Sequence, residues 1–390
     1  MSGPAVFAMQ RLSGRNHGVR RTVLSLILAL LLFGLLEFLV FRPHLYGRFV
    51  EPRSYAGNLE MLILREDALP APDSRPRMTI VGDSRIAECF SETTADSLAG
   101  DRWRFVNAAL PGSTPRLWYY ILREIDPEKD RNSLVVVPLQ DYPDIDPSEN
   151  LANRMLDIRV AILHLGLSDL PNLLPSFDDW GSRFRVARAV LLKGGLLKED
   201  VQDFILDPSR RFSRIELYRQ GWPHWRHTYT GKEGSLDGVR YDPVSGEFTF
   251  PPSLSEQQRA QLVRSVKKPP QRGSMRRYRQ RWLTALVDYY RGTSTRVVFL
   301  RMPRGPVVAS YRKQPQKTGV VTDLARRPHV RMLPEGLFDE LEQPRYFFDT
   351  LHLNSRGRER FTRILVRALG MTREFGAADE LSPGDGKRER

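Results

Sequence analysis

MTIVGDSRIAECF, residues 78–90, joins a short apolar run to a turn and then to helical sequence. The run at 78–81 has the length and composition of a buried strand, and Gly82 and Asp83 interrupt it. A strand that ends in a turn before a helix is the repeating unit of an α/β fold. In such folds the loops beyond the strand ends carry function. Ser84 is therefore either a nucleophile or a helix cap.

The same pattern of short apolar strands and amphipathic helices continues in two blocks. Further strands are expected at 103–107, 134–139 and 296–301, and helices at 115–125, 276–291 and 357–369. Alternation of this kind predicts a mostly parallel sheet flanked by helices on both faces. We therefore expect one α/β domain over residues 77–370, with a large mid-chain insertion at 145–275.

The N-terminal region contains a long apolar stretch. Residues 22–41 read TVLSLILALLLFGLLEFLVF, in which Glu37 is the single charged side chain. Twenty helical residues extend about 30 Å, the thickness of the hydrocarbon core of a bilayer. A signal peptide has a shorter apolar region and an A-x-A-like site, whereas RPH follows this run at 42–44. We expect an uncleaved transmembrane anchor in preference to a signal peptide or a buried core helix.

Three shorter segments complete the expected organisation. Residues 1–21 are a basic tail, 42–76 connect the anchor to the α/β domain, and 371–390 are a flexible tail. Arginines lie on both sides of the anchor, with no acidic residue before it and Glu51 after it. This distribution favours a cytoplasmic N-terminus. We expect a single-pass protein of the cell (inner) membrane with an extracytoplasmic domain.

The composition excludes several classes of protein. Hydrophobic residues make up 41% and aromatic residues 10% of the chain, so it can form a packed core and is not globally disordered. The single cysteine, Cys89, excludes an intrachain disulfide and a cysteine-rich zinc site. The net charge of +14 favours anionic partners such as lipid headgroups or an acidic polymer. Because the domain is predicted to lie outside the membrane, we expect no nucleic-acid partner.

The expected insertion contains three distinctive segments. Helical sequence at 151–163 is followed by GWPHWRHTYT at 221–230 and by a basic stretch, Arg259–Arg281, with nine Lys and Arg residues and no acid. The basic stretch would either bind an anionic lipid or acidic glycan, or form a solvated loop. Aromatic rings stack on sugars, so the middle segment would be either a sugar site or a surface loop. Its candidate residues are Trp222, His224, Trp225 and His227.

Other reactive side chains have simpler interpretations. His224 and His227 lack a nearby carboxylate pair, so no metal site is expected. His164 lies among aliphatic residues and is expected to pack in the core. Cys89 is expected to be a small buried residue, and Asp83 to hold its turn through a local hydrogen bond.

A second motif near the C-terminus supplies a base for Ser84. Residues 348–354 read FDTLHLN and directly precede the last expected helix. A serine hydroxyl needs a base within hydrogen-bond reach and an acid that fixes the tautomer of that base. Asp349 and His352 stand three residues apart, so the carboxylate can reach the near imidazole nitrogen while the far nitrogen faces outward. Ser84, His352 and Asp349 therefore form a candidate catalytic triad.

Acyl transfer also needs donors for an oxyanion. The backbone N–H of Ser84, at a helix start, is one candidate. The N–H of Gly112 follows the second strand in NAALPGSTP at 107–115, where a residue without Cβ lets the backbone come close. The side-chain amide of Gln140, directly after the third strand, is a further candidate.

The order of these motifs resembles the SGNH, or GDSL-type, hydrolase superfamily, over residues 77–140 and 276–370. The resemblance implies a flavodoxin-like three-layer α/β fold in which Ser84 is the nucleophile and Asp349 and His352 complete the triad. It also implies that Gly112 contributes to the oxyanion hole. Where the family usually has an Asn in a G-x-N-D-like motif, this chain reads LQD at 139–141. The GDSR variant adds Arg85 as a candidate substrate-binding residue.

The anchor, the insertion and the GDSR motif look most like the envelope branch of that superfamily. This branch includes membrane-tethered proteins that O-acylate alginate or D-alanylate teichoic acid. The resemblance implies a serine O-acyl esterase or acyltransferase that acts on an acylated envelope polysaccharide without a cofactor. A membrane O-acyltransferase is a possible partner. The alternative is a membrane-tethered glycan-binding or scaffold protein with little or no catalytic activity.

Overall fold

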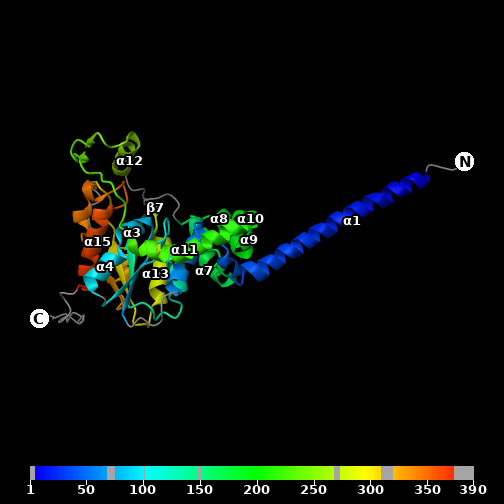
Figure 1. The fold of residues 1–390 in the computed structure, drawn as a ribbon, viewed down its shortest axis with the longest axis horizontal. Helices are drawn as coiled ribbons and strands as arrows, with labels where there is room; N and C mark the ends of the chain where they lie inside the picture. The colour runs from blue at the N-terminus through cyan, green and yellow to red at the C-terminus, as the bar shows by residue number, and fades with distance from the viewer. Residues whose placement is uncertain are drawn as a thin grey trace.

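The computed structural model describes residues 5–67, 75–100, 102–146, 152–267, 273–308 and 319–372. Helix α1 (Ala5–Leu36) projects from the rest of the molecule as a long rod (Figure 1). It begins within the stretch expected as a basic tail and continues as a π-helical turn at Glu37–Phe41. By length and composition, Arg20–Phe41 could cross a membrane. Only 6% of the residues in its most apolar part are buried. The folded domain therefore leaves these apolar side chains uncovered.

A five-stranded sheet forms the centre of the α/β domain, in the order β2–β1–β3–β8–β9. The strands are β1 (Arg77–Ile80), β2 (Arg104–Asn107), β3 (Leu134–Leu139), β8 (Arg296–Arg301) and β9 (Val330–Met332). The neighbouring strands in this sheet are parallel. The chain passes from β1 to β2 on one side and then to β3 on the other. The carboxyl ends of β1 and β3 therefore lie at a topological switch point, where open α/β sheets bind ligands.

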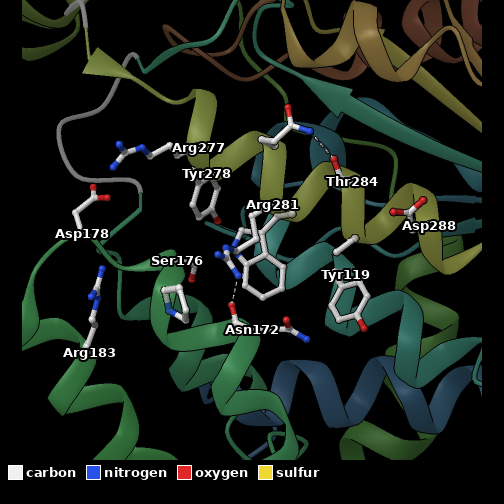
Figure 2. Close-up of a pocket in the computed structure, with 14 residues that line it drawn as sticks. Tyr119, Asn172, Ser176, Asp178, Arg183, Arg277, Tyr278, Arg281, Thr284 and Asp288 are labelled. Carbon is white, nitrogen blue, oxygen red and sulfur yellow. Dashed lines mark hydrogen bonds between the residues drawn. The ribbon is translucent and has the colours of Figure 1, made fainter.

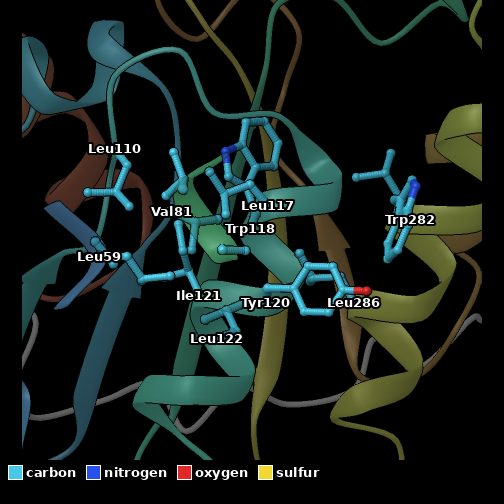
Figure 3. Packing of buried hydrophobic residues seen from close by; sticks show 14 of the residues in the cluster. Leu59, Val81, Leu110, Leu117, Trp118, Tyr120, Ile121, Leu122, Trp282 and Leu286 are labelled. Carbon is cyan, nitrogen blue, oxygen red and sulfur yellow. The ribbon is translucent and has the colours of Figure 1, made fainter. Parts of the chain in front are cut away.

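Helices cover both faces of the sheet. The layer on one face contains α2 (Tyr55–Asp67), α5 (Pro115–Ile125) and α13 (Arg276–Tyr289). The layer on the other contains α3 (Ser84–Cys89), α4 (Glu92–Ala99) and α15 (Ser355–Ala368). Figure 3 shows the first core, in which apolar side chains of α5 and α13 meet.

Strand β3 shows how the two cores arise from one sheet. Val135 and Val137 belong to the first core, and Leu134 and Val136 belong to the second. Side chains alternate between the faces of a strand, so a continuous apolar run supplies both cores. The predicted mostly parallel sheet flanked by helices is confirmed. The sequence did not predict β9 or α14 (Val320–Leu324), because segments of three and five residues are too short to show a period.

Between β3 and β8 the described chain is mainly helical. Its helices are α6 (Leu156–Ala161), α7 (Leu170–Leu173), α8 (Trp180–Leu191), α9 (Lys193–Leu196), α10 (Lys198–Leu206), α11 (Pro208–Thr228) and α12 (Glu256–Lys267). Two small antiparallel pairs join β4 (Ile145–Asp146) to β7 (Gly273–Ser274) and β5 (Arg240–Tyr241) to β6 (Phe248–Thr249). The remaining short helical turns are at Leu45–Arg48, Leu167–Asp169, Leu174–Ser176, Asp339–Leu341 and Pro344–Tyr346.

Helix α6 is shorter than the helix expected at 151–163. The carbonyl groups of Ala152 and Arg154 accept hydrogen bonds from the guanidinium of Arg116, at 3.0 and 2.8 Å. Arg116 is fully buried and also pairs with Asp157 on α6. The buried charge of Arg116 therefore takes up backbone acceptors that a longer helix would have used.

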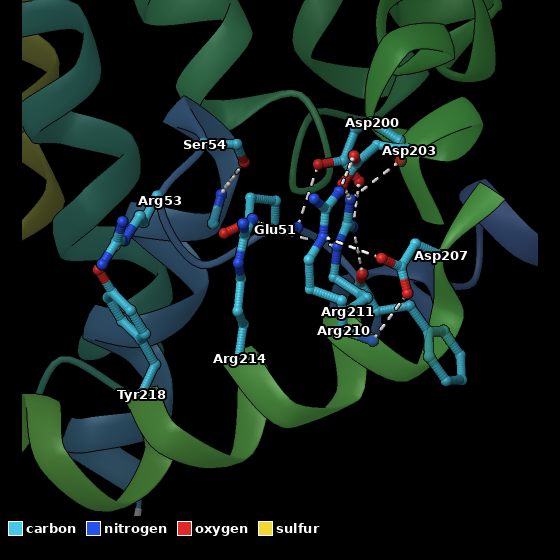
Figure 4. A network of polar contacts seen from close by, with 12 residues as sticks. Glu51, Arg53, Ser54, Asp200, Asp203, Asp207, Arg210, Arg211, Arg214 and Tyr218 are labelled. Atoms are coloured by element: carbon cyan, nitrogen blue, oxygen red, sulfur yellow. Dashed lines mark hydrogen bonds and ion pairs between the residues drawn. The ribbon is translucent and has the colours of Figure 1, made fainter. Parts of the chain in front are cut away.

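The chain that leaves the anchor is fixed to α10 and α11 by a polar network (Figure 4). The guanidinium of Arg211, on α11, donates to the carbonyl oxygen of Phe49 at 2.8 Å and to Asp200 at 2.9 Å. Asp200 also accepts from the hydroxyl of Tyr46 at 2.6 Å. The Arg211 side chain is buried and also pairs with Asp203 at 2.8 Å and Glu51 at 3.3 Å, so several carboxylates compensate its charge inside the protein.

Glu37, the single charge in the apolar run, is buried at the root of the anchor. Its carboxylate accepts from the backbone N–H groups of Lys193 and Gly194, at 2.6 and 2.9 Å. A Cβ at Gly194 would lie 2.7 Å from the ring of Phe41, so the absence of a side chain permits this close contact. Glu37 therefore connects the anchor to α9.

Candidate functional site

Ser84 is the first residue of α3, directly beyond β1. Gly82 makes the turn with a φ of +155°, and a Cβ there would lie 2.5 Å from the side chain of Ile86. Asp83 caps the helix, because its carboxylate accepts from the N–H of Arg85 at 2.9 Å. The local hydrogen bond expected for Asp83 is confirmed. Because Asp83 already caps α3, the interpretation of Ser84 as the helix cap is wrong.

The structure brings Ser84, His352 and Asp349 together from distant parts of the chain. The hydroxyl oxygen of Ser84 lies 2.9 Å from Nε2 of His352. Nδ1 of His352 lies 2.8 Å from Oδ2 of Asp349. With Nδ1–H donating to the carboxylate, Nε2 presents its lone pair to the serine hydroxyl. This is the geometry in which an imidazole can take a proton from a nucleophile.

The Asp349 carboxylate is held by the backbone of its own loop. Oδ1 accepts from the N–H groups of Leu351 and His352, at 2.8 and 2.7 Å. Burial raises the pKa of this carboxyl group, but the hydrogen bonds from His352 and the backbone outweigh burial and keep the pKa below its usual value. Asp349 therefore stays ionised at neutral pH and can stabilise an imidazolium.

Asn354 fixes this loop to α15. Its side-chain oxygen accepts from the N–H of Gly357 at 3.0 Å and so caps the helix. Its amide nitrogen donates to the carbonyl oxygens of Gly234 and Arg345. The loop between residues 348 and 353 is thus anchored at its end, which restricts the positions that His352 can take.

Ser84 opens into a pocket of about 390 Å³ at the carboxyl ends of β1 and β3. The pocket wall combines three arginines with small polar and apolar side chains. The lining residues are Asp83, Ser84, Arg85, Ser113, Thr114, Pro115, Trp118, Leu139, Gln140, Arg154, Met275, Arg279 and Leu351. Its place at the switch point is the one that the sheet topology predicts for a ligand.

Two of the three candidate oxyanion donors face this pocket. Ser84 and Gln140 line it, and the N–H of Ser84 has no acceptor within its own helix because Ser84 is the first helical residue. Gly112 is not among the lining residues, although Ser113 and Thr114 are. Gly112 has a φ of +74° between Leu110 and Ser113, whose backbone groups are hydrogen-bonded at 3.1 Å. The sequence LPGS thus forms a β-turn that requires glycine at its third position.

Three arginines give the pocket a positive wall. Arg85 lies beside Asp83, with a closest approach of 3.5 Å between guanidinium and carboxylate. The guanidinium of Arg279 donates to the carbonyl oxygens of Asp141 and Tyr142, so some of its N–H groups already make structural hydrogen bonds. Arg154 lies 3.2 Å from the position that a Cβ of Gly112 would take. Sequence reasoning missed Arg154, because its segment lies outside the recognised motifs and carries no pattern of its own.

The aromatic and histidine candidates of the middle segment belong to α11. Trp222, His224, Trp225 and His227 lie on its last turns, and their side chains fall outside the described residues. Beyond them, the hydroxyl of Tyr229 bonds to Glu88 on α3. The C-terminal end of α11 therefore meets the helix that begins with Ser84.

A larger cavity, of about 910 Å³, lies at a separate position on α13 (Figure 2). Two residues of the basic stretch, Arg277 and Arg281, line this cavity. Arg281 donates to the carbonyl oxygen of Asn172 at 3.3 Å. Lys268 and Arg272 of the same stretch lie outside the described residues. None of its lining residues is a histidine, whereas the smaller pocket contains Ser84, which lies 2.9 Å from His352.

Cys89 is buried and the side chain of His164 is 5% exposed, but only Cys89 behaves as expected. Cys89 packs in the second core, and burial raises the pKa of its thiol far above the ordinary value. His164 is not a simple packing residue, since both of its ring nitrogens contact carboxylates, Glu60 at 2.7 Å and Glu124 at 2.9 Å. The neighbouring aliphatic sequence concealed this role, because both carboxylates are distant in the chain.

No protein-family model matches this chain, and a comparison with curated proteins finds no match either.

Proposed function

We propose that this protein is a membrane-anchored, SGNH-like serine O-acyl esterase or acyltransferase of the cell envelope. The observation that carries the proposal is the continuous hydrogen-bonded chain from Ser84 through His352 to Asp349, which opens into a pocket at the switch point of the sheet. The resemblance of the GDS and DxxH motifs to those of SGNH hydrolases supports the same reaction class.

In the proposed reaction, the hydroxyl oxygen of Ser84 attacks the carbonyl carbon of an acyl ester. His352 takes the serine proton at Nε2, and the Asp349 carboxylate stabilises the imidazolium that forms. The tetrahedral intermediate carries a negative charge on its oxygen. The N–H of Ser84 and the amide of Gln140 supply donors on the pocket wall, and the N–H of Gly112 would join them if the turn moved toward the ester.

Collapse of this intermediate releases the alcohol, which takes the proton from His352, and leaves the acyl group on Ser84. Either water or a sugar hydroxyl then attacks the acyl-enzyme, with His352 again acting as the base. Water gives hydrolysis and a sugar hydroxyl gives transfer. The two activities share every residue of the site, so the acceptor decides between them.

Arginines in the pocket wall favour a negatively charged substrate. Arg85 and Arg154 line the pocket that contains Ser84, and guanidinium groups bind carboxylates and phosphates through paired hydrogen bonds. An acylated polysaccharide with acidic groups fits this wall, in agreement with the envelope polymers that the resemblance implies. A membrane O-acyltransferase would be the natural source of acyl groups if the reaction is a transfer.

The first test is hydrolysis of p-nitrophenyl acetate by the full-length protein in detergent. We expect Ser84→Ala to lower the rate about 10³-fold or more, because the nucleophile is lost. Ser355→Ala, a matched loss of a hydroxyl near the Asp349 loop, should leave the rate unchanged. A fluorophosphonate probe should label the wild type and Ser355→Ala but not Ser84→Ala. Equal hydrolysis by wild type and Ser84→Ala would overturn the catalytic proposal.

The second candidate function is a tethered glycan-binding or scaffold protein. The observation that favours it is that Gly112 does not line the pocket and that Gln140 replaces the family's asparagine. Such a protein would bind acidic oligosaccharides with equal affinity in the wild type and in Ser84→Ala, and it would not react with the fluorophosphonate. Binding and labelling measured on the same two proteins therefore separate the candidates.

A further inference from the structure

Two histidines and a glutamate meet at the base of the anchor, away from Ser84. His44 follows the anchor directly, Glu60 lies on α2, and His164 follows α6. Nε2 of His44 and Nε2 of His164 lie 2.9 and 2.7 Å from the same oxygen, Oε1 of Glu60. One ligand atom from each residue lies within 4.8 Å of the others. None of the three lines the Ser84 pocket.

The surroundings of this cluster orient its histidines. Nδ1 of His164 lies 2.9 Å from Glu124, so Nδ1 can keep its proton when Nε2 loses the proton that it shares with Glu60 and turns its lone pair to the cluster centre. A Cβ on Gly47 would lie 2.8 Å from both His44 Nε2 and Glu60 Oε2. His44 has a left-handed backbone with a φ of 67°, a conformation that residues other than glycine seldom adopt. The backbone at His44 and Gly47 thus allows the side chains of His44, Glu60 and His164 to approach one another closely.

Without a metal ion, at most one of the two histidines can carry a positive charge in this arrangement. The two imidazole rings are 4.1 Å apart, so two imidazolium cations would repel each other strongly at this distance. A single divalent ion avoids that repulsion, because it binds both imidazoles in their neutral form. The charges of Glu60 and Glu124 together balance the two positive charges of such an ion.

We propose that His44, Glu60 and His164 form a zinc site, with water at the fourth position. Two histidines and one carboxylate are an established zinc ligand set, and donors on a tetrahedral ion lie about 3.3 Å apart. The present separations of 2.7 and 2.9 Å would therefore widen by about half an ångström. Binding would release the protons that lie between Glu60 and the two imidazoles. The ion would connect the anchor, α2 and the segment after α6.

Metal binding can be tested on the full-length protein in detergent with Zn²⁺ and Co²⁺. We expect one equivalent of Zn²⁺ after dialysis, a raised melting temperature with Zn²⁺ relative to EDTA, and a Co²⁺ spectrum of a four-coordinate site. His44→Ala should weaken Zn²⁺ binding at least 100-fold. Its side chain is 34% exposed, so its removal should leave the fold intact, as circular dichroism would show. His329→Ala, a histidine outside the cluster, should bind like the wild type.

Two further variants separate a zinc site from a hydrogen-bonded cluster. Gly47→Ala keeps all three ligands but crowds His44 and Glu60, so it should weaken Zn²⁺ binding. Glu124→Gln keeps all three ligands but removes the carboxylate that pairs with His164 and with Arg123, and it should lower affinity about 10–100-fold while keeping the Co²⁺ spectrum. Equal Zn²⁺ content in the wild type and His44→Ala, or no bound Zn²⁺ in either, would overturn the proposal.

An independent observation concerns the exposed face of α8. Trp180, Phe184 and Leu191 lie at helical spacing on one side of the helix and are 81%, 69% and 45% exposed. At the end of the neighbouring helix α10, Ile205 and Leu206 are 70% and 75% exposed. Large apolar side chains that gather on one surface mark a site of interaction.

This apolar surface continues directly from the root of the anchor. The carbonyl oxygen of Leu191 accepts from Arg42, the residue after the π-helical turn, at 3.2 Å. Next to it, α9 holds Glu37 of the anchor through two backbone N–H groups. In Figure 1, α8, α9 and α10 lie beside the end of α1. Exposed Arg185 and Arg188 border the apolar side chains on α8.

We infer that the α8–α10 surface lies in the lipid interface around the anchor. The inference rests on α1 as a membrane anchor. A bilayer crossed by α1 would meet the surface from which α1 emerges, and tryptophan, phenylalanine and arginine are typical of interfacial helices. Burial of this surface in lipid would fix the orientation of the α/β domain relative to the membrane.

The test places a polarity-sensitive label on the full-length protein in vesicles. Phe184→Cys reports on the apolar face, and Val244→Cys, at a position 94% exposed on the β5–β6 turn, is the control. Cys89 is buried and should not react. We expect lipid-borne quenchers to act on residue 184 and aqueous quenchers on residue 244. A label at 184 that is open to water, or shielded from both quenchers by another protein, would overturn the inference. Co-sedimentation of the chain with vesicles would show separately whether α1 is inserted.

Discussion

Gln140 is the residue at which this site departs from the SGNH pattern. Its amide lies in the wall of the pocket that contains Ser84, where the family uses an asparagine. If Gln140 donates to the oxyanion, Gln140→Ala should lower kcat about 10²–10³-fold with little change in KM. Gln140→Asn has a shorter amide and should recover part of the rate. A change confined to KM would instead assign Gln140 to substrate binding.

Asp349 provides a second prediction at this scale. In Asp349→Asn the side-chain amide can donate to Nδ1 of His352, which favours the tautomer that carries its proton on Nε2, so His352 would present an N–H instead of a lone pair to Ser84. We expect kcat for p-nitrophenyl acetate to fall about 10⁴-fold while the fold is retained. Asp237→Asn is the control, because Asp237 is an exposed carboxylate next to Leu236, whose N–H donates to the carbonyl oxygen of Phe347 near the Asp349 loop. A loss of less than tenfold would argue against the role of Asp349.

The triad could be predicted because each of its members carries a recognisable local motif. Ser84 and His352 are 268 residues apart, yet each stands beside a turn that marks the end of a strand or the start of a helix. Glu60, Glu124 and Arg154 have no such marks. Their partners come from other elements, so their roles depend on packing that a single sequence does not encode locally.

Among the elements, α2 is attached to the sheet edge by a buried charge cluster. Glu66 pairs with Arg65 at 2.7 Å and with Arg77 of β1 at 3.2 Å, and Arg104 of β2 lies 3.6 Å away. Burial raises the pKa of Glu66, but the three arginines outweigh burial and lower it below the usual value. Its contribution to stability is therefore present above the ordinary glutamate pKa of about 4.3 and is lost as the pH falls through the lower, folded-state pKa.

Glu66→Gln removes this charge from beside the buried Arg65 and Arg77 and the half-buried Arg104. We expect the variant to be about 3 kcal/mol less stable than the wild type at pH 7. The difference should shrink at acidic pH, because the wild-type carboxylate then becomes protonated and resembles the amide. Thermal unfolding followed by circular dichroism at pH 7 and pH 3 measures both effects. Glu359→Gln, in an exposed pair with Arg363, should cost less than about 0.5 kcal/mol at either pH.

The junction between the anchor and α11 yields a prediction about local opening. Arg211→Leu would leave Asp200 with the hydroxyl of Tyr46 but without its arginine partner, and it would remove the hydrogen bond to the carbonyl oxygen of Phe49. Amide hydrogen exchange should then speed up in the segment after the anchor and on α10, while the central sheet stays protected. Arg53→Ala removes an exposed contact to Tyr218 and is the control. Unchanged exchange in Arg211→Leu would contradict the role given to this network.

At the scale of the whole molecule, the proposed topology can be tested in intact cells. The chain has basic residues on both sides of the anchor, and the bias toward a cytoplasmic N-terminus comes from the acid-free segment that precedes it. We expect protease added outside the cells, after permeabilisation of any outer barrier, to degrade the α/β domain. Full protection of the domain would reverse the proposed orientation. Disrupted cells, in which the domain is degraded in either orientation, provide the control.

The fold was predictable where the sequence has a strong period. The apolar run of β3 and the amphipathic α5 and α15 have the bounds expected for them, or nearly so. The helices between β3 and β8 were less predictable, because several of them expose apolar side chains. On α8, for example, the large apolar residues Trp180 and Phe184 would suggest a buried face, but both are exposed. Period alone cannot distinguish an apolar side chain that faces the core from one that is exposed.

Helix α11 connects the anchor to the candidate active site. Its first turns hold Arg211 against the chain that leaves the anchor, and the residue after its last turn, Tyr229, bonds to Glu88 on the helix of Ser84. Its 21 residues span about 30 Å. In the proposed arrangement, the length of this helix sets the distance between Ser84 and the bilayer surface. Ser84 would then react with esters on polymer chains at that distance, and esters at the level of the lipid headgroups would be out of its reach.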